Sequence, residues 1–141
     1  MTRRLSQGGR ANQHGRTAET ILESLLYDRA PHAEIVPHAK IGHTIYGRPL
    51  EADLYICGLA NFPKGLAIES KWQELNGSVD EKYPYLVANI RTCYPCPAIV
   101  VFGGSGARPD ALGWLKRQVD GMHLIAVLSL EEFITWCNRN L

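Results

Sequence analysis

The chain has 141 residues, 45% of them hydrophobic and 21% charged, and a formal net charge of +1 at pH 7. This length suits a single domain, and so small a net charge argues against a protein that binds polyanions through its overall charge. No apolar run approaches the roughly 20 residues of a membrane span. With no evident signal peptide, the four cysteines favour reduced thiols. We therefore expect a cytoplasmic protein that does not contact membranes.

The N-terminal segment is basic and rich in glycine. Residues 1–18 contain no acidic residue, and their arginines are Arg3, Arg4, Arg10 and Arg16. We predict that residues 1–16 form a flexible arm that follows DNA phosphates, with a solvated terminus as the alternative. Residues 17–141 then form the domain. It opens with a helix, capped by Thr17, whose apolar residues recur at helical spacing as far as Pro31.

Extended segments follow this helix. Residues 34–38 and 41–46 are predicted to be extended, with a turn over residues 47–49. Residues 50–56 and 66–73 then alternate apolar and polar side chains, as strands with one buried face do.

The polar faces of these last two strands carry a distinctive set of residues. Asp53 lies on the first, and Glu69, Lys71 and Gln73 share the second. If the strands pair, Asp53 lies beside Glu69, and two carboxylates next to a lysine make a site for a hard divalent cation and an attacking water. The alternative is a simple ion pair between Glu69 and Lys71 on an exposed strand.

The second half alternates helices with strands. Its first helix begins either at a Ser78 capping box or near Tyr83, with Pro84 in the first turn. It is followed by a strand (98–102), a helix from Pro109, a strand (123–128) and a last helix with the capping box Ser129-x-x-Glu132. The order α-β-β-β-α-β-α-β-α predicts an α/β fold with a mixed central β-sheet flanked by helices.

Two further features leave alternatives open. Cys93 and Cys96 have the spacing of zinc ligands, but one such pair is only half a site, and a structural role without metal is the alternative. Lys82, just past the strand that carries Glu69, is a candidate ligand for a DNA phosphate, with a solvated helix start as the alternative.

Asp53, followed by Glu69-Ser70-Lys71 on a neighbouring strand, behind a helix that bears Glu19, resembles the PD-(D/E)XK nuclease superfamily. That superfamily includes restriction enzymes, homing endonucleases and Holliday-junction resolvases. The resemblance covers most of residues 15–128 and implies a restriction-endonuclease-like core. One departure is Ala52, which stands where the superfamily pattern has proline.

The resemblance implies a role for each matching residue. Asp53 and Glu69 correspond to the metal-binding carboxylates, and Lys71 corresponds to the lysine that positions the attacking water. Glu19 matches an acid that acts on the metal through water, and Gln73 matches a glutamine found in some branches. The chemistry itself suggests the Ser70 backbone carbonyl as a further ligand, because Mg²⁺ needs few protein ligands.

These inferences predict a Mg²⁺-dependent DNA endonuclease of restriction or homing type, with Mn²⁺ as a substitute ion. A Holliday-junction resolvase is the first alternative, and a catalytically idle DNA-binding or assembly module is the second. The partner is then double-stranded or branched DNA. Because cutting both strands generally needs two active sites, we expect a homodimer or a higher symmetric assembly.

Overall fold

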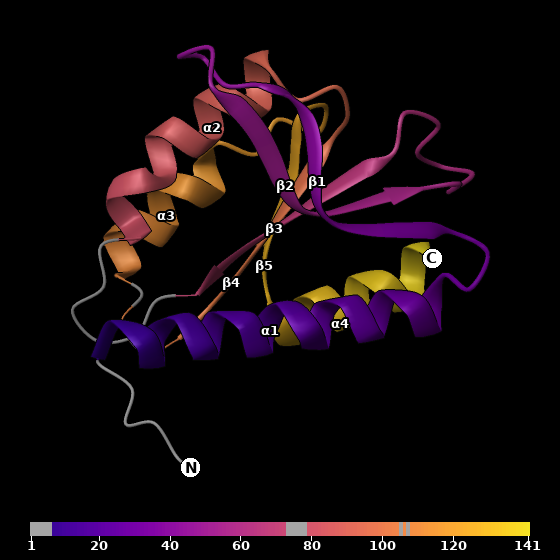
Figure 1. Ribbon diagram of the computed structural model, residues 1–141, viewed down its shortest axis with the longest axis horizontal. Helices are drawn as coiled ribbons and strands as arrows, with labels where there is room; N and C mark the ends of the chain where they lie inside the picture. Colours follow the sequence, from indigo (N-terminus) through magenta and orange to yellow (C-terminus); the bar gives the residue numbers. More distant parts are fainter. Residues whose placement is uncertain (1–6, 73–78, 105, 107) are drawn as a thin grey trace.

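The computed structural model describes residues 7–72, 79–104, 106 and 108–141, without the side chains of residues 7–15 and 79. One five-stranded sheet forms its centre, with strand order β1-β2-β3-β4-β5 (Figure 1). The strands are β1 (Glu34–His43), β2 (Pro49–Cys57), β3 (Leu66–Trp72), β4 (Ala98–Gly103) and β5 (Leu124–Ser129). The first three are antiparallel and the last three parallel, so β3 belongs to both parts. The predicted mixed sheet is therefore confirmed.

Helices cover both faces of this sheet. They are α1 (Gln7–Arg29), α2 (Tyr83–Thr92), α3 (Pro109–Arg117) and α4 (Leu130–Asn140), and the 3-10 turn η1 (Val79–Lys82) precedes α2. Figure 1 shows α1 and α4 on one side of the sheet and α2 and α3 on the other. This arrangement is the predicted restriction-endonuclease-like α/β class.

Each sheet face has its own hydrophobic core, and the alternation of β3 explains why. Leu66 and Ile68 face the core that includes residues of α1 and α4. Ala67 lies in the other core, which includes residues of α2 and α3. Because successive strand side chains point to opposite faces, Glu69 follows Ala67 onto the side of α2. The core of β3 thus fixes the direction in which its acidic residue points.

The first helix is longer than predicted. α1 begins at Gln7, so the N-cap predicted at Thr17 is wrong, and residues 7–16 of the predicted arm are helical. No proline lies between residues 1 and 30, so the chain holds no strong breaker of the helix upstream of Thr17. The two segments that follow, predicted to be extended over residues 34–38 and 41–46, meet in one strand, β1. A register shift between Lys40 and Gly42 takes the place of the predicted break.

The second half follows the predicted order closely. α2 begins at Tyr83 with Pro84 in its first turn, which confirms that alternative, and Ser78 lies outside the described residues. α4 carries the predicted capping box: the Ser129 hydroxyl accepts from the Glu132 N–H, and the Glu132 carboxylate accepts from the Ser129 N–H. No helix in the described part of the chain is long and apolar enough to cross a membrane.

Candidate active site

The candidate site lies where β2 and β3 separate. The pairs of this antiparallel ladder run from Ile56 with Leu66 to Leu54 with Ile68, and one further step along the same register sets Asp53 opposite Glu69. The Oδ2 atom of Asp53 accepts a hydrogen bond of 2.7 Å from the Ser70 N–H. The Asp53 side chain therefore satisfies the Ser70 N–H at the point where the pairing of β2 with β3 ends. This bond fixes the Asp53 carboxylate against β3.

Glu69 is the most deeply buried carboxyl group of this site. Glu69 is only 3% exposed, and its Oε1 accepts a hydrogen bond of 2.5 Å from the Tyr94 hydroxyl. Burial and the negative charge of Asp53 raise the pKa of Glu69 to about 8, against the opposing effects of Lys71 and Tyr94. Because its pKa lies above neutrality, Glu69 keeps its proton at neutral pH in the absence of a bound cation.

Lys71 and Glu19 complete the charged cluster. Lys71 follows Glu69 by two positions on β3, so it lies on the same face, and its charge lowers the pKa of both Glu69 and Glu19. Glu19 projects from α1, where burial and the charge of Asp53 raise its pKa. Residues from α1, β2 and β3 therefore influence one another electrostatically.

His38 connects the helix to the sheet beside this cluster. Its Nε2 lies 3.6 Å from Oε2 of Glu19, and its Nδ1 lies 3.1 Å from Oε1 of Glu51. It has a positive φ of 51°, a conformation that non-glycine residues seldom adopt. Sequence reasoning assigned no function to His38, because a single histidine on a strand carries no motif. Its position shows that it orients Glu19 on the side of α1.

A cavity of about 360 Å³ opens beside the carboxylates. Its lining includes Asp53, Glu69, Lys71, Tyr94, Arg48 and Lys82. The predicted phosphate ligand Lys82 is thus brought to the site, and Arg48 is a cation that sequence reasoning placed only in a turn. Both are exposed, whereas Glu69 is buried. Two exposed cations and the exposed carboxylate of Glu51 therefore line the mouth of the cavity, whereas Glu69 lies in its interior.

Several predicted site residues are not placed here. Gln73, Arg3 and Arg4 lie outside the described residues, and Arg10 belongs to α1 but its side chain is not described. Arg16 is exposed on α1, where its charge lowers the pKa of Glu19. It therefore lies at the edge of the charged cluster.

Tyr94 is the main residue that sequence reasoning missed. It stands in the loop after α2, between Cys93 and Pro95, and 25 positions separate it from Glu69. No periodicity or motif connects the two, so only the packing of α2 against the sheet brings the hydroxyl to the carboxylate. Cys93 and Cys96, the proposed half of a zinc site, are free thiols, half-buried and buried respectively.

The oxygen donors of the site are the carboxylates of Asp53 and Glu69. Within the described residues, no group of three or more histidine, cysteine or acidic side chains gathers as a metal cluster. Two carboxylates are the protein ligands that Mg²⁺ usually takes, because it keeps several of its waters. The donor chemistry therefore fits a hard divalent cation.

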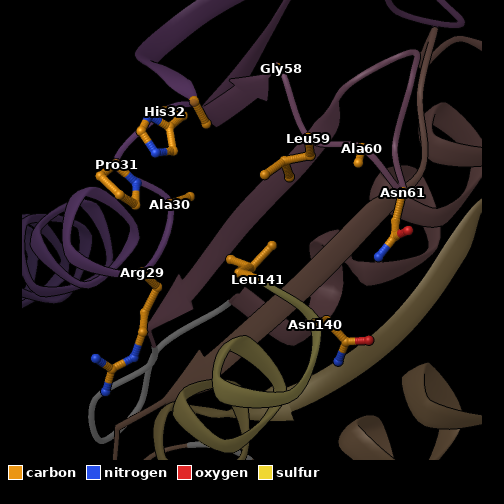
Figure 2. Close-up of a pocket in the computed structure, with 11 residues that line it drawn as sticks. Arg29, Ala30, Pro31, His32, Gly58, Leu59, Ala60, Asn61, Asn140 and Leu141 are labelled. Carbon is orange, nitrogen blue, oxygen red and sulfur yellow. The ribbon is translucent and has the colours of Figure 1, made fainter.

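A second cavity, of about 240 Å³, shares no lining residue with the first. Figure 2 shows that its walls come from three separated parts of the chain: residues 29–33 after α1, residues 58–61 after β2, and the end of α4. Leu59, Pro31 and Leu141 make much of it apolar, and no carboxylate side chain lines it. It therefore lacks the donor set of the first cavity.

The mixed sheet and the carboxylates at the separation of β2 and β3 define a restriction-endonuclease-like nuclease core. A family model described as a PD-(D/E)XK nuclease superfamily domain matches residues 10–141. The chain therefore belongs to the PD-(D/E)XK nuclease superfamily, and the resemblance seen in the sequence is confirmed. Membership indicates a nuclease, and nucleases of this superfamily usually use divalent metals. Searches of curated proteins and of solved structures returned no match.

Proposed function

We propose that the protein is a Mg²⁺-dependent endonuclease that hydrolyses phosphodiester bonds in double-stranded DNA, in a restriction or homing reaction. The observation that carries this proposal is that Asp53, Glu69 and Lys71 line one cavity, in a chain that belongs to a nuclease superfamily. Mn²⁺ is the expected substitute ion.

Asp53 and Glu69 are the residues that would hold the cation. Burial and the charge of Asp53 favour the protonated form of Glu69, so the carboxylates would release protons when they hold a cation. When bound, the ion supplies positive charge for the developing phosphoryl charge and acidity for an attacking water. The Ser70 N–H keeps Asp53 in place, while Tyr94 keeps Glu69 in place.

Lys71 and Glu19 act around this pair. The Lys71 ammonium, on the same strand face as Glu69, donates hydrogen bonds to the attacking water or to a phosphate oxygen. Glu19 accepts hydrogen bonds from water on the side of α1, with its orientation held by His38. Positioning of this kind can account for a large part of the barrier reduction in phosphoryl transfer.

The two exposed cations that line the cavity support DNA as the substrate. A phosphodiester that approaches the carboxylates passes Arg48 and Lys82, which line the same cavity and attract its negative charge. A single site cuts one strand at a time, so cleavage of both strands favours a symmetric dimer that presents two sites.

The experiment compares substrates and metal conditions. A supercoiled plasmid and a four-way junction are each incubated with the protein, with Mg²⁺ or with EDTA. Metal-dependent linear products with fixed ends support restriction or homing cleavage, whereas selective cutting of the junction supports a resolvase. Binding without cleavage of either substrate supports the idle module.

Lys71→Ala tests the site itself. We expect it to abolish cleavage and to leave DNA binding largely unchanged. The matched control is Lys64→Ala, because Lys64 is an exposed lysine in the loop before β3 and does not line the cavity. If Lys71→Ala still cuts at the wild-type rate, the assignment of the active site is wrong.

A further inference from the structure

The loop that joins β1 to β2 has a fixed conformation. We call residues 44–48 the hairpin tip. The Thr44 N–H donates to the Arg48 carbonyl at 2.7 Å, and the Gly47 N–H donates to the Thr44 carbonyl at 2.8 Å. The Thr44 hydroxyl oxygen also accepts from the N–H groups of Tyr46 and Arg48, at 3.2 and 3.3 Å. Local bonds of this kind define a turn before any partner is present.

The hairpin tip is also attached to α2. The Oδ1 atom of Asn89 accepts a hydrogen bond of 2.9 Å from the Ile45 N–H, and Asn89 is only 3% exposed. Next to this bond, the rings of Tyr46 and Tyr85 stack with centroids 5.3 Å apart and an interplanar angle of 17°. Thr44, Arg48, Tyr85 and Asn89 all line the carboxylate cavity. The hairpin tip is therefore a preorganised wall of the candidate active site.

This wall presents an unusual combination of side chains to solvent. Tyr46 is 70% exposed and Ile45 is 44% exposed, although a single exposed apolar residue is by itself unremarkable. Here the exposed ring is held by a stacked partner, and it neighbours Arg48, a cation that lines the cavity with Lys82. A rigid aromatic side chain beside two cations fits the duplex backbone, where charged phosphates alternate with deoxyribose rings whose C–H groups an aromatic ring can pack against.

We propose that the hairpin tip and the start of α2 form the surface that positions duplex DNA over the carboxylates. Arg48 and Lys82 bind phosphates on either side of the scissile one, and the Tyr46 ring packs against the sugar and base edges between them. Arg48 follows Tyr46 by two positions, so one rigid turn delivers both contacts. The inference rests on the proposed function for its substrate class, and it adds the residues that hold that substrate.

The test measures binding apart from cleavage. Fluorescence anisotropy of a labelled duplex is recorded in EDTA over a range of salt concentrations. Arg48→Gln and Lys82→Gln should each reduce the slope of log K against log salt by about 0.9, the value for one phosphate contact to duplex DNA. Tyr46→Ala should weaken binding about tenfold, which lies within the range for loss of an aromatic contact to a base, and should leave the slope unchanged.

Matched controls separate this surface from general effects. Arg139 is an exposed arginine on α4 that lines a different cavity, so Arg139→Gln should change neither the affinity nor the slope. Tyr27 is an exposed tyrosine on α1, at 51%, so Tyr27→Ala should bind DNA as the wild type does. Thermal melting of each variant checks its fold, and Tyr46→Phe keeps the ring and should bind normally. Because Arg48→Gln tests the same surface independently, a folding defect in Tyr46→Ala does not remove the test.

Three outcomes overturn the proposal. The first is that Tyr46→Ala and Arg48→Gln bind duplex DNA with wild-type affinity and salt slope, even if the wild type cleaves DNA. The second is that the wild type does not bind duplex DNA, and the third is that the variants weaken binding to single strands only. Failure of the proposed function gives a different pattern, because binding would then depend on Tyr46 and Arg48 while no metal condition yields cleavage.

Discussion

The Tyr94 hydroxyl donates a 2.5 Å hydrogen bond to Oε1 of Glu69 and so ties the loop after α2 to the middle strand of the sheet. This bond favours the charged form of Glu69, whereas burial and Asp53 raise the pKa of that carboxyl. Burial and the charge of Glu69 together raise the pKa of Tyr94 far above its ordinary value. The tyrosine therefore remains a neutral donor at neutral pH.

Loss of this donor should weaken metal binding. In Tyr94→Phe, the Glu69 carboxylate loses a fixed partner, and the pKa of Glu69 rises further, so protons compete better with the cation. We expect the apparent affinity for Mg²⁺ at neutral pH to fall about 10- to 100-fold, as is usual when a residue that orients a metal ligand is removed. Isothermal titration with Mg²⁺ in the absence of DNA measures this directly, and the loss should shrink as the pH is raised.

The control for this variant is Tyr55→Phe. The Tyr55 hydroxyl donates at 2.8 Å to the backbone carbonyl of Lys64, away from the carboxylates. Like Tyr94→Phe, the Tyr55→Phe variant lacks one tyrosine hydroxyl. It should have slightly lower stability and an unchanged affinity for Mg²⁺. Equal effects of the two variants on metal binding would show that Tyr94 has a structural role only.

Glu69→Gln should stabilise the metal-free protein above acidic pH. The folded protein holds a proton on Glu69 up to a pH of about 8, whereas the ordinary pKa is 4.5. The raised pKa therefore favours folding fully below pH 4.5, and this contribution is lost as the pH rises to about 8. The amide that replaces the carboxyl has no acidic proton to lose, can still accept the Tyr94 hydrogen bond and can donate to Asp53. We expect a gain on the order of 2 kcal/mol at pH 7.

Urea unfolding in EDTA from pH 4 to 9 measures that gain. The difference between Glu69→Gln and the wild type should grow across the window between the two pKa values and level off above about 8. A difference that does not vary with pH would contradict the raised pKa. Cleavage should be lost at every pH, because an amide is a poor replacement for a carboxylate as a ligand of a hard cation.

The capping box of α4 gives a second prediction about pH. Ser129→Ala removes the acceptor for the Glu132 N–H and should cost about 1 kcal/mol in the free energy of unfolding. The hydrogen bond from the Ser129 N–H lowers the pKa of Glu132 below its ordinary 4.5. The contribution of that carboxylate is therefore present above pH 4.5 and is lost as the pH falls.

Thr135→Ala is the control for the capping box, because Thr135 is an exposed hydroxyl residue within the same helix whose Oγ1 donates to the Glu131 carbonyl. It should be neutral or slightly stabilising. Thermal or urea unfolding of both variants at pH 7 and pH 3 compares them. A Glu132→Gln variant should lose less stability at pH 3 than at pH 7, and an equal loss at both would count against a charged cap.

Gly103 tests the packing at the end of β4. A Cβ atom at this position would overlap the Trp72 ring, whereas one at Gly113 on α3 would meet only the end of Arg117, at 3.5 Å. Gly103→Ala forces the indole to move and should cost roughly 1–3 kcal/mol. Gly113→Ala should instead stabilise α3 by up to about 1 kcal/mol. Unfolding curves of the two variants should therefore shift in opposite directions.

The strands of the site could be predicted because their information is local. Leu54 and Ile56 alternate with the polar residues Asp53 and Tyr55, Leu66 and Ile68 share one face of β3, and these four apolar residues are buried. That alternation fixes which face each strand buries, so it also fixes where Asp53, Glu69 and Lys71 point. The start of α1 could not be predicted in the same way, because Thr17 offers a local cap while nothing upstream breaks the helix.

The sequence by itself determined the order of elements, the mixed sheet and the charged face shared by Glu69 and Lys71, since periodicity and capping act over a few residues. Only the tertiary structure decided that Tyr94 holds Glu69 and that the hairpin tip closes one wall of the cavity. Those contacts join residues many positions apart. They depend on how α2 packs on the sheet, and that packing is set by the shape of a whole core and by no single stretch of chain.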